Sequence, residues 1–302
     1  MQIELDTRRD LIGIGWMLVT GLCFVAVNGI VRGLEGALPA PQAAFIRFLF
    51  GTGFLLPVLL PALRRGFSAP VWQLFALRGV LHVMAVIGWF YAMSRITVAE
   101  VTAIGFLNPI MVTVGAALFL GEKLAARRIA AIFVALLGAL IVLRPGIREL
   151  DPGHLSQLGA SVTFGVSYLL AKHLSDRVPA AVVVAMMSLT VSVGLAPLAY
   201  AVWVPPSIAQ IGWLGLVAVF ATLGHYTMTR AFAAAPLTVT QPVTFLQLIW
   251  ASLLGVLVFH EPLDGWVILG GGLMIGAITY ITWREARKRA TTKTPPVDVT
   301  KA

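Results

Sequence analysis

The sequence predicts an all-α integral membrane protein with ten transmembrane helices in two inverted five-helix repeats. Three observations support this fold class: the composition, the number of long apolar stretches and a residue pattern that occurs twice. Of the 302 residues, 59% are hydrophobic and 12% are charged, and the mean hydropathy is +0.90. A chain of this composition has too few polar side chains to cover a soluble globule.

Ten apolar stretches are the expected elements, since a helix needs roughly 17 to 25 apolar residues to cross about 30 Å of hydrocarbon. They cover residues 11–32, 40–61, 71–93, 97–120, 126–144, 155–173, 178–203, 210–231, 238–259 and 264–283. The first stretch follows several charged residues, is longer than the apolar core of a signal peptide and lacks a small-residue cleavage site. We therefore expect it to stay as the first helix.

A residue pattern in the first half of the chain recurs in the second half. The residues around Phe24, Pro39, Pro57, Phe106 and Glu122 recur around Phe164, Pro179, Pro197, Phe245 and Glu261. The offset is nearly constant (164 − 24 = 140; 261 − 122 = 139). It predicts repeats at 1–148 and 149–284, followed by a disordered cytoplasmic tail at 285–302. Each repeat has an odd number of spans, so the second must be inverted, an arrangement typical of secondary transporters.

The positive charges predict the orientation in the membrane. Ten spans place both termini on one side, where we count sixteen Lys and Arg residues in loops and tails. The opposite side has four, namely Arg32, Arg95, Arg144 and Arg148. The excess places both termini in the cytoplasm of a multi-pass protein of the cell inner membrane. Orientation and anionic lipid then explain the net charge of +9, and a nucleic-acid partner is not needed.

Several short motifs resemble the EamA branch of the drug/metabolite transporter superfamily. The motifs are Arg78-Gly79, Trp89-Phe90-Tyr91-Ala92-Met93, Val98-Ala99-Glu100, Asn108-Pro109, Gly121-Glu122-Lys123-Leu124, Ala231-Phe232, Ala235-Pro236-Leu237, Gln241-Pro242 and His260-Glu261-Pro262. The resemblance covers about residues 11–283 and implies a ten-helix carrier. Within this branch the chain resembles the bacterial riboflavin and S-adenosylmethionine uptake groups. It departs from the family at His260, where Gly is usual.

Two arginines lie deep inside predicted spans, where a charge costs several kcal/mol unless it faces a partner or water. Arg47 and Arg78 are about eight residues from a span end, which is roughly 12 Å below an interface. Glu100 enters a span at the depth of Arg47, and we predict an ion pair or water-bridged contact between them. This pair either locks two helices together or has a gating or substrate-linked role.

Arg78 and His82 lie four residues apart on one helix face. Arg78 either binds helix C-terminal carbonyl groups or binds an electron-rich substrate group such as a carboxylate, a phosphate or a ring carbonyl. Further polar side chains within spans form interhelical hydrogen bonds or a shared polar interior: Asn28, Asn108, Tyr168, His225, Gln241 and Gln247. Aromatic walls are expected from Trp89, Tyr91, Phe106, Phe245 and Trp250.

No pattern in the sequence indicates catalysis. The chain lacks a Gly-x-Ser-x-Gly elbow, a Walker loop and a Cys/His cluster, and its aspartates lie outside the spans. Cys23 is the only cysteine, which excludes an intrachain disulfide. We therefore expect no enzymatic activity, no cofactor and no metal.

The sequence thus predicts a secondary transporter that carries a small organic metabolite by alternating access. Aromatic walls and arginine favour a planar or amino-acid-like compound, for example a riboflavin-like one. A proton step would use Glu100, His82 or His225, and exchange is the alternative. The residues do not distinguish import from export. The alternatives are a metabolite or drug exporter of the same fold and, from another class, a non-transporting membrane binder or lipid-modifying enzyme. The expected partners are the substrate and the bilayer, and the protein is a monomer or homodimer.

Overall fold

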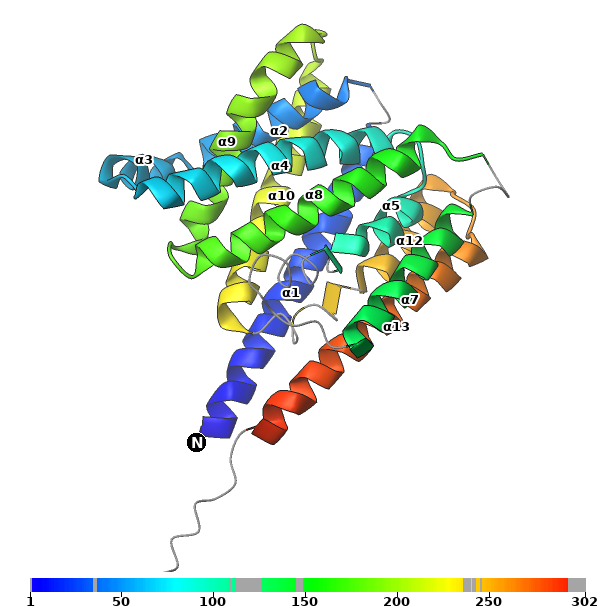
Figure 1. Ribbon diagram of the computed structural model, residues 1–302. Coiled ribbons are helices and arrows are strands. Elements are labelled where there is room, and N and C mark those ends of the chain that lie inside the picture. Colours follow the sequence, from blue (N-terminus) through cyan, green and yellow to red (C-terminus); the bar gives the residue numbers. More distant parts are fainter. Residues whose placement is uncertain are drawn as a thin grey trace, which may run out of the picture.

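The computed structural model describes residues 2–34, 37–108, 110–111, 126–144, 149–235, 240, 243–244 and 246–292. All regular secondary structure in this part of the chain is helical (Figure 1). The helices are α1 (Gln2–Gly33), α2 (Ala40–Phe54), α3 (Leu56–Arg65), α4 (Ala69–Met93), α5 (Val98–Gly105), α7 (Ala126–Leu143), α8 (Pro152–Ser175), α9 (Ala180–Ala201), α10 (Ile208–Ala234), α12 (Leu246–Phe259) and α13 (Gly265–Thr292).

The helices follow the predicted apolar stretches. Within the described residues, α1, α4, α9 and α10 are each long and apolar enough to cross a membrane. The bent pair α2–α3 would make a fifth span, and α7, α12 and α13 contain shorter apolar segments. Large apolar side chains are exposed along many of these helices, as expected where lipid replaces water as the solvent. The chain is therefore built as a multi-pass membrane protein.

The second predicted span is broken between α2 and α3, which meet at an angle of 75°. Pro57 is the second residue of α3, a position where proline is tolerated because the missing N–H has no partner within the helix. Its repeat equivalent Pro197 lies inside α9, which continues through it. Equivalent prolines therefore stand at the start of a new helix in the first repeat and inside a continuous helix in the second.

The C-terminal helix is longer than the sequence predicts. Helix α13 continues to Thr292, so residues 285–292 are helical although they belong to the expected disordered tail. The segment Glu285-Ala286-Arg287-Lys288-Arg289 explains this, because all of these residue types favour helices. Basic side chains near a helix C-terminus also interact favourably with the helix dipole. Residues 293–302 lie outside the described part of the chain.

The helix contacts are symmetric under exchange of the two repeats. Helix α1 packs along α10 and α8 packs along α4, while α2 packs on α9 and α7 on α13 (Figure 1). Thr52 and Ser192, 140 positions apart, share a hydrogen bond of 3.2 Å, which places equivalent residues of the two repeats against each other. Arg32 donates to the carbonyl oxygen of Met93 at 3.0 Å. The equivalent Lys172 donates to that of Phe232 at 3.2 Å.

Candidate substrate cavity

A cavity of about 180 Å³ lies where the helices of the two halves meet. Helices α1, α2, α4 and α5 contribute from the first half, and α8, α10 and α12 from the second. Its polar lining residues are Thr20, Asn28, Arg47, His82, Thr102, Asn108, Gln157, Tyr168, His225, Thr244 and Gln247. A shared polar interior is therefore present within an otherwise apolar helical bundle.

Aromatic rings form the flat walls of this cavity. Phe164 and Tyr168, one turn apart on α8, are stacked with a centroid distance of 5.7 Å and an interplanar angle of 14°. Phe24, Trp89, Phe90 and Phe106 line other parts of the cavity. Flat apolar faces combined with a few polar groups are the usual composition of a site for a small organic molecule.

Two histidines from different repeats meet at the cavity. The ring centroids of His82 and His225 are 5.4 Å apart, and both side chains are buried. His82 Nδ1 lies 3.0 Å from Ser167 Oγ. His82 Nε2 and His225 Nδ1 have no hydrogen-bond partner within the described part of the chain. Buried polar atoms without a protein partner point to a molecule that binds inside the cavity.

Arg47 is a cavity-lining residue of α2. Its side chain is 7% exposed, and its guanidinium carbon lies 3.9 Å from the centroid of the Phe48 ring. Among the described residues, the guanidinium has no hydrogen-bonded or ion-paired acceptor. The predicted contact between Arg47 and Glu100 is therefore not formed.

Glu100 is used at the N-terminus of α5 instead. Its carboxylate accepts hydrogen bonds from Thr97 N–H at 2.9 Å and from Thr97 Oγ1–H at 3.0 Å, as the second half of a capping box. The other carboxylate oxygen lies 3.4 Å from His154 Nε2. The Glu100 carboxylate thus stabilises the start of α5, and this explains why it does not pair with Arg47.

Arg78 packs between helices and does not line the cavity. Its side chain is 1% exposed and donates to the carbonyl oxygen of Val183 at 3.0 Å and to Met187 Sδ at 3.2 Å, both on α9. Val183 lies in the first turn of α9, so its carbonyl group is not the helix C-terminal one that the first alternative requires. Arg78 thus connects α4 to α9, four residues before the cavity residue His82.

The other predicted site residues divide into two groups. Those that line the cavity are Asn28, His82, Trp89, Asn108, Tyr168 and Gln247. Tyr91 and Trp250 do not line it, and they are 39% and 45% exposed on the outside of the bundle. Gln241 lies outside the described residues.

Thr20, Thr102 and Gln157 also line the cavity, and none of them is among the predicted site residues. Thr102 accepts a hydrogen bond from Asn28 at 3.4 Å, and Gln157 Nε2 donates to the carbonyl oxygen of Val101 at 3.1 Å. A glutamine inside an apolar stretch is a signal that could have identified Gln157. Threonine is common in membrane helices and gives no such signal.

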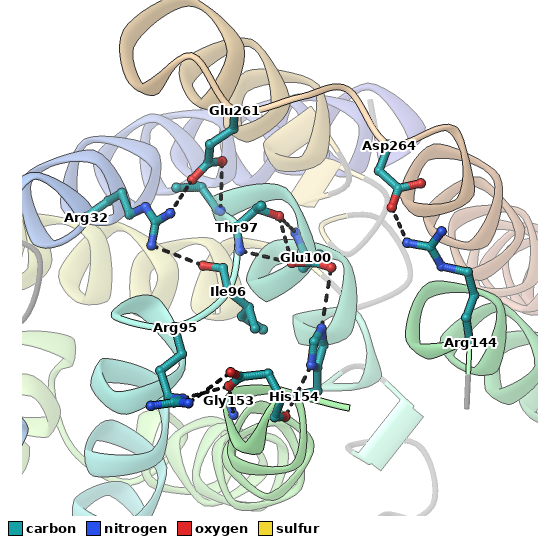
Figure 2. A network of polar contacts seen from close by, with 12 residues as sticks. Arg32, Arg95, Ile96, Thr97, Glu100, Arg144, Gly153, His154, Glu261 and Asp264 are labelled. Atoms are coloured by element: carbon teal, nitrogen blue, oxygen red, sulfur yellow. Dashed lines mark hydrogen bonds and ion pairs between the residues drawn. The ribbon is translucent and has the colours of Figure 1, made fainter. Parts of the chain in front are cut away.

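An ion pair joins the two repeats at the predicted outer end of the protein (Figure 2). Arg32 Nη2 of α1 is 2.9 Å from Glu261 Oε1, which follows α12, and Glu261 Oε2 accepts from the backbone N–H of Val98 at 3.1 Å. Arg32 lies four residues after Asn28 and Val98 four before Thr102, which is about one helical turn in each case. This contact, the Arg32–Glu261 latch, therefore lies about one turn beyond lining residues of the cavity.

Two further ion pairs surround the latch at the same end (Figure 2). Arg95 Nε is 2.7 Å from Asp151 Oδ1, and Arg144 pairs with Asp264. The hydrogen bond from Arg95 lowers the pKa of Asp151 and raises the pKa of Arg95. The latch is the most buried of the three pairs, with side chains that are 18% and 8% exposed, whereas those of the Arg95–Asp151 pair are 41% and 31% exposed and form a surface contact.

Comparison with known proteins gives the same assignment for both halves of the chain. The model of the EamA-like transporter family matches residues 11–144 and 151–283. A riboflavin transporter of Rhizobium johnstonii is 28% identical over 294 residues, covering 95% of this chain and 96% of the relative. An S-adenosylmethionine uptake transporter of Rickettsia bellii is 24% identical over 276 residues, covering 91% and 95%.

Two further similar proteins are an exporter and a protein of known structure. A pseudopaline exporter of Pseudomonas aeruginosa is 26% identical over 277 residues, covering 89% of this chain and 95% of the relative. A crystal structure of a protein superposes with a TM-score of 0.63 at 20% identity, covering 93% of this chain and 99% of that chain. This second match supports the fold alone.

Proposed function

Since this chain belongs to the EamA-like transporter family, we propose that it is a secondary transporter for a small organic metabolite. In this proposal ten transmembrane helices form two inverted repeats, residues 1–148 and 149–284, with both termini in the cytoplasm. The repeats move against each other so that the central cavity opens first to one side of the cell inner membrane and then to the other.

One observation carries this proposal. The cavity is lined by both repeats, contains polar atoms without a protein partner in the described residues, and lies one turn below the Arg32–Glu261 latch. A structural polar cluster would satisfy its own hydrogen bonds. A carrier instead needs unpaired groups at its centre and a closure that forms and breaks next to them.

The shape and chemistry of the walls favour a planar substrate. The stacked pair Phe164 and Tyr168 offers a flat surface, and Asn28, Asn108 and Gln247 offer amide groups for hydrogen bonds. Similar proteins are named for riboflavin, S-adenosylmethionine and pseudopaline. We propose a riboflavin-like or other planar metabolite. Because the relatives include both uptake transporters and an exporter, we propose no direction.

Counterflow in proteoliposomes tests this function. Purified protein is reconstituted with one unlabelled compound of a panel of planar metabolites inside, riboflavin among them, and entry of the same compound in labelled form is measured. We expect at least one compound to enter faster than in protein-free vesicles. Tyr168→Leu should slow this entry, whereas Tyr200→Leu, on a side chain that is 85% exposed, should not. If the protein binds these compounds but exchanges none of them, it is a non-transporting binder and the proposal fails.

A further inference from the structure

Arg47 differs from the other buried arginine in what surrounds its charge. Arg78 is held by the carbonyl oxygen of Val183 and by Met187 Sδ. Arg47 faces the cavity and has no acceptor among the described residues, with the Phe48 ring against its guanidinium plane. A guanidinium group has five N–H donors and cannot lose its charge. Leaving all of them without an acceptor inside a membrane protein is costly, and the cost is relieved when an anion enters.

The described cavity walls offer no negative charge that could compensate Arg47. Among the lining residues there is no Asp, Glu or Lys, and the titratable neighbours are His82, His225 and Tyr168. Glu100, at a similar depth, is committed to the helix cap and to His154. The cavity is therefore electropositive. A positive charge in a low-dielectric cavity favours an anion and disfavours a cation.

The other unpaired atoms describe the rest of the ligand. Asn108 Oδ1 and Gln157 Oε1 are buried acceptors without a partner in the described chain, and His82 Nε2 and His225 Nδ1 are also unpaired. The Phe48 ring contacts both groups: its centroid is 3.9 Å from the guanidinium carbon of Arg47 and 5.8 Å from the centroid of the His82 imidazole. The unpaired groups therefore combine a fixed cation, neutral acceptors and flat aromatic neighbours.

We propose that the substrate is a planar organic anion and that Arg47 binds its anionic group, a carboxylate or another oxyanion. The planar part lies against the ring walls, and N–H or O–H groups of the substrate donate to Asn108 and Gln157. This inference rests on the proposed transport function, which it deepens by naming the class of substrate. It assigns to Arg47 the binding of an electron-rich substrate group, which the sequence offered as one of two alternatives for Arg78.

Pairs of planar probes, of which one member carries an anionic group and the other is neutral, test this assignment. The full-length protein in lipid nanodiscs is titrated with quinoline-2-carboxylate and quinoline-2-carboxamide, and with flavin mononucleotide and riboflavin, by isothermal calorimetry. The wild type should bind the anionic member of a pair about 10- to 100-fold more tightly, the range expected for a charge-assisted hydrogen bond. Arg47→Gln should abolish that preference while it changes binding of the neutral member less than about threefold.

The control is Arg230→Gln, which removes the same charge at an exposed position near Trp16 and away from the cavity walls. It should keep the preference for the anion. The proposal is overturned if the neutral member binds as tightly as the anion to the wild type, if no anionic member binds, or if both variants weaken the anion equally. The wild-type comparison does not depend on either variant folding. Because binding needs no transport, failure of counterflow would refute the carrier function and leave the anion site standing.

Discussion

Replacing Glu261 by glutamine should open the predicted outer end of the protein. Glu261 Oε1 lies 2.9 Å from Arg32 Nη2, and Oε2 accepts from the Val98 N–H at 3.1 Å. Glutamine keeps the size of the side chain and an acceptor for Val98, but it removes the charge that Arg32 binds. The closed state then contains a guanidinium without its counterion, whereas water hydrates this group in the open state. The variant should therefore favour the open state.

The expected magnitude follows from the burial of the latch. Truncating one partner of a buried ion pair costs 2–5 kcal/mol or more. The side chains of Arg32 and Glu261 are 18% and 8% exposed, so water compensates part of that cost. Arg32 also keeps its hydrogen bonds to the carbonyl oxygens of Met93 at 3.0 Å and Ile96 at 3.4 Å. We therefore expect about 2 kcal/mol, which is roughly a 30-fold change in the ratio of open to closed molecules.

Cysteine labelling measures this ratio. The one natural cysteine, Cys23, is buried and is replaced by alanine. Thr102→Cys then places a thiol in the cavity wall, at a side chain that is 8% exposed in the closed structure. Intact cells are treated with a membrane-impermeant maleimide. Adding Glu261→Gln should raise the labelling rate about 30-fold, because the rate follows the open population.

Asp151→Asn is the matched control for this experiment. It removes the charge of the Arg95–Asp151 pair, whose side chains are 41% and 31% exposed, and exposed pairs contribute little. Asparagine still accepts from the Gly153 N–H and so keeps the cap of α8. Labelling should change less than about threefold. Equal rates for the two variants, or no change with Glu261→Gln, would refute the assignment of the latch.

The remaining prediction concerns helix packing. Gly138→Ala would place a Cβ 2.6 Å from the backbone oxygen of Gly270 and separate α7 from α13, with a cost of about 1–3 kcal/mol in detergent unfolding. Gly272→Ala, with no neighbour within 4 Å, should unfold like the wild type, and equal stability of both variants would exclude tight packing at Gly138.

The fold could be predicted where composition and apolar length decide it. The predicted apolar stretches at 71–93 and 178–203 appear as the single helices α4 and α9, because a span must satisfy its own backbone hydrogen bonds. The break after Phe54 could not be predicted, since Pro57 and Pro197 occupy equivalent positions and one of them lies within a continuous helix. Whether a proline ends a helix depends on the neighbours that satisfy the freed carbonyl group, and these come from tertiary packing.

The cavity residues could be predicted in part. Polar side chains in spans gather at the centre because lipid cannot satisfy them, as Asn28 and Tyr168 show. Tyr91 does not share the cavity wall with Trp89, because residues two positions apart on a helix point in directions about 200° apart. Glu100 could have been recognised as a cap from the Thr97-x-x-Glu100 spacing, which is a capping box. The absence of an acceptor for Arg47 in the described chain could not be predicted, because it depends on all the helices around it.

The two ends of the molecule differ in how equivalent cations are bound. Arg32 and Lys172 occupy matching positions (172 − 32 = 140), and each donates to a carbonyl oxygen of its own repeat. Arg32 forms an ion pair with Glu261 of the other repeat. Lys172 instead forms an ion pair with Asp176, four residues further along its own repeat, with 3.1 Å between Lys172 Nζ and Asp176 Oδ1. Within the described residues, the same sequence unit thus joins the repeats through an ion pair at one end and not at the other. The proposed alternating access requires such a difference, because the two ends must open in turn. Since the repeats are related by inversion, they can swap roles, so that the ion pair between the repeats breaks at one end and an equivalent contact forms at the other.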